Sequence, residues 1–215
     1  MSPREIAAIF VEPIQGEGGY VLPPPEFHRK LKAFAEKHGI IYVVDEVQSG
    51  MGRTGRFLAI ENFGVDPDVV VLAKGLASGL PLGAVVAKKK YMTWKAGTHG
   101  STFGGNPLAC EASLATLGLL ESGLMAHAAR MGGRLLAKLE ELRKDFPMIG
   151  DVRGLGLMAG VELVRDRGTR EPAAEEAHEA AQRAFRKGLL LLPCGESAIR
   201  FCPPLVVNAR EVDTA

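Results

Sequence analysis

The feature that most constrains the fold is the alternation of short apolar runs with amphipathic helical patterns. Short apolar runs of this kind are typical of strands in parallel sheets, whose two faces are covered by helices. The sequence therefore predicts an α/β fold with a largely parallel sheet that is covered on both sides. The candidate strands are Ala7–Val11, Ile40–Val44, Val69–Leu72 and Gly83–Ala87.

Helical patterns lie between and after these runs. Pro25 opens a segment with one apolar face and Gly39 ends it, as is typical of a helix with an N-terminal proline and a C-terminal glycine. Two more helices are predicted at Pro107–Glu121 and Leu124–Lys144. After Pro147 the pattern changes, which predicts a larger domain over residues 1–146 and a smaller α+β domain over residues 147–215. The elements predicted in the smaller domain are the strands Gly156–Leu163, Leu189–Leu192 and Ile199–Phe201 and the helix Ala174–Lys187.

Composition excludes several classes of function. The chain of 215 residues has 26 Lys+Arg against 25 Asp+Glu, a balance that gives no electrostatic reason to expect a nucleic-acid or membrane partner. Its three cysteines form no Cys-x-x-Cys pair and cannot all pair within the chain, which indicates reduced thiols in a cytoplasmic protein without a metal site. No apolar stretch approaches the roughly 20 residues of a membrane span, and the first residues do not resemble a signal peptide.

Lys74 and Asp45 carry the first functional signal. Each follows a predicted buried strand, and open α/β sheets bind ligands just beyond the carboxyl ends of their strands. A desolvated lysine favours its neutral amine, which can form a Schiff base with an aldehyde, and an aspartate nearby can keep a pyridine nitrogen protonated. This pair is what pyridoxal phosphate (PLP) chemistry requires from a protein. Taken alone, Lys74 is better explained as a surface lysine after a strand, and Asp45 and Glu46 can be charged residues that end a buried strand and enter solvent.

The segment from Gly50 to Gly55 matches G-x-G-x-x-G, a pattern found in dinucleotide-binding proteins. That motif turns directly from a strand into a helix, so that backbone N–H groups meet a pyrophosphate. Here Asp45 and Glu46 intervene and would repel a diphosphate, and no convincing helix begins at Arg56. The sequence therefore disfavours a dinucleotide site.

Four segments follow one another in a specific order and spacing: Val11–Gly19 (VEPIQGEGG), Val44–Gly55 (VDEVQSGMGRTG), Asp68–Gly75 (DVVVLAKG) and Gly100–Ala109 (GSTFGGNPLA). They resemble the class III aminotransferases, fold type I PLP enzymes that include 4-aminobutyrate, ornithine and acetylornithine aminotransferases. The resemblance implies the PLP-dependent transferase fold type I, in which a mostly parallel sheet is flanked by helices. Residues 1–146 would be the second half of the PLP-binding large domain, and residues 147–215 part of the C-terminal small domain.

The resemblance implies a role for each cofactor-binding residue. Lys74 would be the Schiff-base lysine, and its amine, once displaced by substrate, would carry a proton. Asp45 would contact the pyridinium nitrogen and Gln48 the phenolic oxygen of the cofactor. Ser101 and Thr102 lie in the segment implied to reach the cofactor phosphate, with the Thr102 hydroxyl supplied by the neighbouring subunit. A site built across subunits implies a homodimer.

Glu17, Arg200 and Glu12 are the implied substrate-binding residues. In the ornithine and 4-aminobutyrate branch, an arginine in an R-F-x-P-P segment binds the 2-oxoglutarate carboxylate, and a glutamate in a Q-G-E segment neutralises that arginine otherwise. Arg200 and Glu17 occupy these positions, and a bidentate arginine–carboxylate contact is strong and directional. Glu12 is expected to line the same pocket. His99 and Arg153, lone residues beside glycines, are interpreted as structural.

The chain departs from the family at both ends. The Gly/Ser-rich phosphate loop and the aromatic side chain that stacks on the pyridine ring lie upstream in the family and are not found here. Residues 210–215 stop where the family begins a final helix. The chain thus resembles about the second half of a longer enzyme, and as given it is expected to be inactive by itself.

The resemblance predicts transfer of an amino group from an ω-amino donor to 2-oxoglutarate. The donor is expected to be 4-aminobutyrate first, and ornithine or acetylornithine next. Two alternatives stay open. A PLP-dependent racemase or epimerase uses the same scaffold without a keto-acid acceptor, although the Glu17 and Arg200 pair argues against it. The other alternative is an inactive fragment that serves only as a binding or assembly module.

Overall fold

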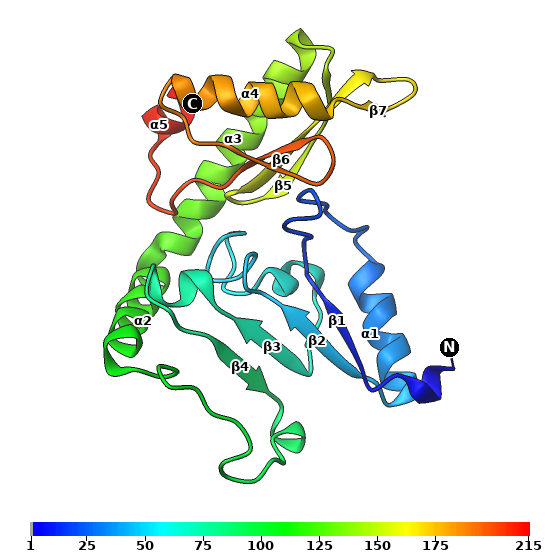
Figure 1. The fold of residues 1–215 in the computed structure, drawn as a ribbon, viewed down its shortest axis with the longest axis vertical. Helices are drawn as coiled ribbons and strands as arrows, with labels where there is room; N and C mark the ends of the chain where they lie inside the picture. The colour runs from blue at the N-terminus through cyan, green and yellow to red at the C-terminus, as the bar shows by residue number, and fades with distance from the viewer. Residues whose placement is uncertain (1) are drawn as a thin grey trace. The chain divides into compact units, whose positions relative to one another are not determined.

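The computed structural model describes residues 2–215, and the chain forms two compact units (Figure 1). The first unit contains the chain up to Pro13 together with Pro23–Met51 and Arg56–Gly123. The second unit contains Leu124–Ala215 and two short segments from earlier in the chain, Ile14–Leu22 and Gly52–Gly55.

The first unit is built on a four-stranded sheet in the order β1-β2-β3-β4. The first three strands are parallel and β4 is antiparallel to β3. Each predicted strand is present with its ends shifted by no more than one residue, and the sheet is mostly parallel as predicted. The strands are β1 (Ala8–Val11), β2 (Ile41–Asp45), β3 (Val69–Leu72) and β4 (Ala84–Ala87).

Helix α1 (Phe27–His38) packs against one face of this sheet and ends at Gly39, whose φ of 69° lets its N–H reach the last carbonyls of the helix. Its residue His28 is fully buried against Tyr42 of β2. His28 Nε2 lies 3.0 Å from the Pro13 carbonyl oxygen, and Nδ1 lies 2.8 Å from the Tyr42 hydroxyl. A carbonyl can only accept, so Nε2 carries the proton and Nδ1 accepts from Tyr42. Burial lowers the pKa of His28.

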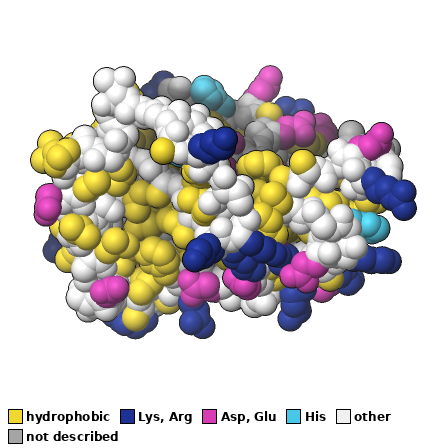
Figure 2. Space-filling model, turned by 90° about the horizontal axis from the view of Figure 1, so that it is seen from below, with side chains coloured by type: hydrophobic (Ala, Val, Ile, Leu, Met, Phe, Trp, Pro, Cys, Tyr) yellow, Lys and Arg dark blue, Asp and Glu magenta, His cyan; other side chains and the backbone are white. Residues whose placement is uncertain are grey.

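Both faces of the sheet are open at its edges. Val86 of β4 lies on the face of α1 and is 56% exposed. Phe10 pairs with Val43, and Val85 belongs to the row that runs through Val71 to Asp45, so these residues share one face. Phe10 is 73% exposed and Val85 is 52% exposed. The edge strands are therefore less covered than expected, since the sequence predicted a sheet that is covered on both sides. Figure 2, seen from below the view of Figure 1, shows broad hydrophobic areas between charged side chains.

The second unit is built on an antiparallel sheet in the order β5-β6-β9-β8, with β7 paired to β6. Its core contains Leu135 and Leu139 of α3, Ala177 of α4 and Val161 and Ile199 of the sheet. The sequence did not predict β5, which contains two glycines and two charged residues. The elements are β5 (Ile149–Leu155), β6 (Met158–Asp166), β7 (Glu171–Pro172), β8 (Leu192–Cys194), β9 (Ala198–Phe201), α3 (Met125–Asp145), α4 (Ala174–Arg186) and α5 (Ala209–Thr214).

The division between the units differs from the predicted boundary at residues 146 and 147. Helix α3 belongs to the second unit, because its apolar stripe lies in the same core as β6 and α4. The break comes earlier, at Gly123, whose φ of 122° interrupts the helical run between α2 (Pro107–Leu119) and α3. Helical periodicity shows that α3 has an apolar face, but not which sheet that face covers.

By length and composition alone, the helical run Pro107–Asp145 is long and apolar enough to cross a membrane, and 17% of its most apolar window is buried. This finding differs from the expectation that no apolar stretch approaches such a length. It arises mainly from α2, whose residues Leu108, Leu114 and Leu119 are 69%, 62% and 59% exposed.

Candidate active site

Lys74 lies just beyond β3, as the first residue of a short 3-10 turn, Lys74–Ala77. Its φ of 40° is in the left-handed region, which costs energy for a residue with a side chain and persists only where the surroundings enforce it. The side chain is exposed, so the expectation that burial desolvates the amine is wrong for this chain. The strand ends at Leu72, and Lys74 is already beyond its buried part.

Lys74 lines a pocket of about 600 Å³ in the first unit. Ser101, Phe103 and Gly104 line the same pocket, together with the loop 79–83. The structure therefore brings Lys74 and Ser101 to one cavity, although 26 residues separate them in the sequence. Ser101 Oγ also accepts a hydrogen bond from the Gly104 N–H at 3.1 Å. Thr102 is exposed and lies outside the set that lines this pocket.

Asp45 is the last residue of β2, and its register partner in β3 is Val71. Since β2 and β3 are parallel, Asp45 and Lys74 follow the same edge of the sheet at neighbouring strand ends. Asp45 is half-buried, and its Oδ1 accepts from the Val47 N–H at 3.0 Å, which begins the turn that carries Gln48. Gln48 is half-buried in that turn, and Glu12 is half-buried directly after β1, at the same edge.

Glu46, the neighbour of Asp45, has a different role. It is fully buried, where its Oε2 accepts from Ser49 Oγ at 2.7 Å and its Oε1 accepts from the Ile60 N–H at 2.8 Å. Burial raises the pKa of this carboxyl group. A Cβ on Gly50 would lie 2.8 Å from the Glu46 carbonyl oxygen, so only glycine fits there. Glu46 therefore stabilises the loop after β2 through hydrogen bonds in the interior of the unit. The sequence did not distinguish Glu46 from Asp45.

The G-x-G-x-x-G segment forms a tight loop and no helix. Gly52 and Gly55 have φ values of 82° and 86°, which only glycine adopts easily. A Cβ on Gly55 would lie 2.8 Å from the Ala129 Cβ of α3. Turn geometry and close packing therefore explain these glycines.

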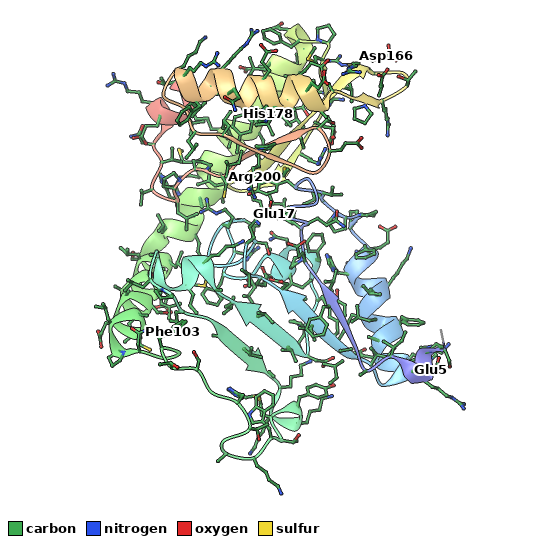
Figure 3. All side chains as sticks on the ribbon, in the orientation of Figure 1. Glu5, Glu17, Phe103, Asp166, His178 and Arg200 are labelled. Atoms are coloured by element: carbon green, nitrogen blue, oxygen red, sulfur yellow. The ribbon has the colours of Figure 1, made fainter. Side chains whose placement is uncertain are left out.

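Glu17 and Arg200 meet in the second unit. Arg200 Nη1 donates to Glu17 Oε1 in an ion pair between β9 and the loop that precedes Tyr20 (Figure 3). The Arg200 side chain is 17% exposed and the Glu17 side chain 72%. Burial opposes the charge on Arg200, but the hydrogen bond that Arg200 donates to Glu17 and the charge of the Glu17 carboxylate, with smaller contributions from Tyr20 and Cys194, together outweigh burial and raise the pKa of the guanidinium. Arg200 Nε is buried and has no hydrogen-bond partner within residues 2–215.

The model of the family described as aminotransferase class-III matches residues 1–215. The chain belongs to the class III aminotransferases. This agrees with the resemblance seen in the four ordered segments.

Curated relatives extend well beyond this chain. It is 42% identical to the leucine/methionine racemase of Thermococcus litoralis, over 97% of this chain and 47% of the relative. It is 44% identical to the 5-aminovalerate aminotransferase DavT of Pseudomonas putida, over 98% and 50%. It is 46% identical to the acetylornithine aminotransferase of Gloeobacter violaceus, over 97% and 50%. The chain thus spans about half the length of the curated relatives it matches.

Solved structures of transaminases also match nearly the whole of this chain and about half of their own length. A transaminase from the marine bacterium Virgibacillus matches with a TM-score of 0.93 and 34% identity, over 99% of this chain and 51% of that one. An amine transaminase from an uncultivated Pseudomonas species, in its PLP-bound form, matches with a TM-score of 0.90 and 37% identity, over 98% and 50%. The predicted fold type I of PLP-dependent transferases is therefore confirmed, and the cofactor of this class III family is pyridoxal 5'-phosphate.

The residues at the edge of the first sheet fit this cofactor. Lys74 presents an exposed amine in a pocket, as reaction with an aldehyde requires, and Ser101 lines that pocket with a hydroxyl group suited to a phosphate. Asp45 provides a carboxylate at the neighbouring strand end, suited to a protonated pyridine nitrogen.

Proposed function

We propose that this chain carries the cofactor-binding lysine and the acceptor-binding arginine of a PLP-dependent aminotransferase. The reaction moves an amino group from an ω-amino donor to 2-oxoglutarate, with 4-aminobutyrate as the first candidate donor and ornithine or acetylornithine as the next. The observation that carries the proposal is the Glu17–Arg200 ion pair. An arginine with its own carboxylate partner is suited to an enzyme whose two substrates differ in having a carboxylate at that position.

Bound PLP supplies an electron sink for the negative charge that develops on the substrate Cα. Lys74 would bind the cofactor aldehyde and, once released, move a proton between the substrate Cα and the C4′ position. Asp45 would keep the ring nitrogen protonated, and Gln48 would hydrogen-bond the phenolic oxygen. Ser101 and Thr102 would contact the phosphate, with Thr102 supplied by the partner in a homodimer.

Arg200 would bind the distal carboxylate of 2-oxoglutarate or glutamate after Glu17 has turned away. With a donor that lacks this carboxylate, Glu17 would stay on Arg200 and neutralise it. A planar guanidinium recognises either carboxylate with the same geometry, so the exchange needs no other change in Arg200. Glu12, half-buried after β1, is proposed as a further substrate contact.

The test is an assay of the natural full-length protein with PLP and each candidate donor, with and without 2-oxoglutarate. We expect glutamate to form from 4-aminobutyrate, ornithine or acetylornithine only when 2-oxoglutarate is present. Glutamate formation from none of these donors, at any concentration of 2-oxoglutarate, would contradict the proposal.

A racemase or epimerase is the second candidate, because one relative of 42% identity is named a leucine/methionine racemase. Such an enzyme returns the proton to the other face of Cα and needs no keto acid. Incubation with single enantiomers of leucine, methionine, alanine and isoleucine, followed by chiral chromatography, separates the two reactions. Interconversion of enantiomers without 2-oxoglutarate would favour the racemase.

The third possibility concerns residues 1–215 by themselves. The cofactor phosphate carries nearly two negative charges, and of the residues in this chain the resemblance assigns only Ser101 and Thr102 to it. We therefore propose that this chain alone binds PLP weakly and does not transaminate. A PLP titration of purified 1–215, followed by absorbance and paired with a glutamate assay, tests this. A saturating signal with steady turnover from a soluble dimer would contradict it.

A further inference from the structure

Arg153 of β5 reaches the loop that carries Glu17. Its Nη2 and Nε donate to the Gly19 carbonyl oxygen at 2.5 and 3.1 Å, and Nε also lies 3.2 Å from the Tyr20 carbonyl oxygen. The side chain is only 14% exposed. One guanidinium therefore binds two consecutive carbonyl groups, which follow directly after the residues that present the Glu17 carboxylate.

The guanidinium is itself held from the other side. Arg153 Nη2 pairs with Glu162 Oε2 of β6 at 2.5 Å, and Ser197 Oγ donates to the second oxygen of the same carboxylate at 2.8 Å. Arg153 Nη1 pairs with Asp151 at 3.0 Å. Because both oxygens of Glu162 are bonded, this carboxylate helps to orient the planar fork of Arg153, which binds the loop.

The loop needs such support because its backbone is unfavourable. Gly19 has a φ of 118° and Tyr20 a φ of 53°, and a bulky residue such as tyrosine rarely adopts a positive φ. The Tyr20 side chain is 1% exposed, and a Cβ on Gly160 of β6 would lie 3.0 Å from the Tyr20 Cβ. Arg153 thus binds the carbonyl groups of the two consecutive residues in this loop that have a positive φ.

The backbone of Glu17 is fixed as well. The Gly195 N–H donates to the Glu17 carbonyl oxygen at 2.8 Å, and a Cβ on Gly195 would lie 3.0 Å from the Gly19 Cα. In contrast, the Glu17 side chain is 72% exposed. The Glu17 side chain therefore has room to rotate while the backbone that carries it stays in place.

We propose that Arg153 is a positioning residue for the Glu17–Arg200 pair. It holds the loop at Gly19 and Tyr20, so that Arg200 is released by rotation of the Glu17 side chain and not by movement of the loop. Without Arg153, Glu17 spends less time on Arg200, and the guanidinium of Arg200 is more available to other reagents and carboxylates. The inference rests on the proposed role of Glu17 and Arg200 in choosing between substrates.

The experiment measures the reactivity of Arg200 in residues 1–215 without cofactor. Phenylglyoxal modifies accessible arginines, and peptide mass spectrometry gives the rate at each site. Arg134, which pairs with Asp213 in the same unit, is the internal reference. We expect Glu17→Gln to speed modification of Arg200 by about threefold, the size expected for loss of a partly exposed ion pair. Arg153→Gln should produce a similar increase, with Arg134 unchanged.

Two further variants separate positioning from general stability. Asp151→Asn alters a contact of the same guanidinium that does not involve the loop, so the rate at Arg200 should stay at the wild-type value. The double variant Glu17→Gln/Arg153→Gln should react no faster than Glu17→Gln, because Arg153 acts through Glu17.

The outcomes distinguish the two proposals. If Glu17→Gln leaves the rate at Arg200 unchanged, the ion pair does not protect Arg200, and the proposed function loses its main support. If Glu17→Gln raises the rate but Arg153→Gln does not, only the role of Arg153 is overturned. If Arg153→Gln also speeds modification of Arg134, that variant disturbs the second unit as a whole. The Arg153→Lys variant then decides whether Arg153 positions the loop. Lysine keeps the charge but lacks the planar fork, so an unchanged rate at Arg200 in that variant would overturn the inference.

Discussion

In the first unit, Lys74 is exposed and Asp45 is half-buried at the open end of a parallel sheet, whereas in the second unit Arg200 is 17% exposed and already paired with Glu17. The first pair is proposed to bind a ligand with a carbonyl group and a ring nitrogen. In the second pair the Glu17 carboxylate binds the guanidinium that is proposed to bind a substrate carboxylate. An amine that reacts with an incoming ligand has to be accessible. A guanidinium that is mostly buried, in a site proposed to alternate between two substrates, instead benefits from an internal carboxylate as its counter-charge.

The largest effect is expected from Lys74→Ala, because it removes the amine on which the first site depends. In the active protein this variant should lose covalent attachment of PLP and all turnover. Borohydride reduction followed by peptide mapping is the measurement, and Lys88→Ala, which removes a lysine paired with Asp66, is the matched control. Reduced cofactor on Lys88, Lys89 or Lys90 would show that the assignment of Lys74 is wrong.

Asp45→Asn should retain the cofactor but lose at least about a hundredfold in rate, since each 1.36 kcal/mol of lost transition-state stabilisation costs about tenfold. An amide cannot keep the ring nitrogen protonated as a carboxylate does. Steady-state kinetics and the cofactor content of the purified variant test this together. Turnover near the wild-type value would mean that Asp45 only ends its strand and starts the turn at Val47.

Glu17→Ala should change the two half-reactions unequally, because Arg200 would then be free at all times. Glutamate should react as well as before or better, and the ω-amino donor should react more slowly by about fivefold, a factor in the range measured for partly exposed ion pairs. Stopped-flow measurements of each half-reaction provide the test. An equal loss with both substrates would remove the switch and leave Glu17 with a structural role.

The smallest effect is expected for the pH dependence of stability that comes from His28, which is buried against Tyr42 of the first sheet. Burial lowers the pKa of His28, so the folded chain stays neutral there while the unfolded chain binds a proton below about pH 6.5. Stability from His28 is therefore present above that pH and is lost as the pH falls through it, by at most about 1.4 kcal/mol per pH unit.

Denaturant unfolding of the chain at several pH values between 7.5 and 5 would measure this loss. His28→Gln should be less stable at neutral pH, since it disturbs the bonds to Pro13 and Tyr42, and its stability should depend less steeply on pH. If the variant and the wild type show the same slope, the pH dependence comes from other groups.

The sequence predicted those features that depend on neighbouring residues. The four strands of the first sheet and the positions of Lys74 and Asp45 at strand ends follow from short-range apolar patterns. The exposure of Lys74 did not follow, because a pattern shows where a strand ends but not how open the space beyond it is. For the same reason Glu46 was grouped with Asp45, although one side chain is buried and the other is half-buried.

Features that depend on distant residues were missed. The sequence indicates a structural role for Arg153 but not its partners, because its contacts with Gly19 and Tyr20 join residues more than 130 positions apart. Strand β5 was missed because its glycines weaken the apolar alternation. Gly154 of this strand has a φ of 151°, and only glycine fits at that position because a Cβ would lie 2.3 Å from the Met158 carbonyl oxygen. Such close approaches are specified by the partner strand and are invisible in a local window.

The division of the chain between its units has a consequence for how the protein is made. The chain passes from one unit to the other after residues 13, 22, 51, 55 and 123, so neither unit is a continuous stretch of sequence. A ribosome releases the Glu17 loop long before Arg153 and Arg200, and the second unit can be completed only when nearly all of the chain has been synthesised. A fragment that begins at residue 124 would contain Arg153 and Arg200 and lack the loop that these two arginines contact.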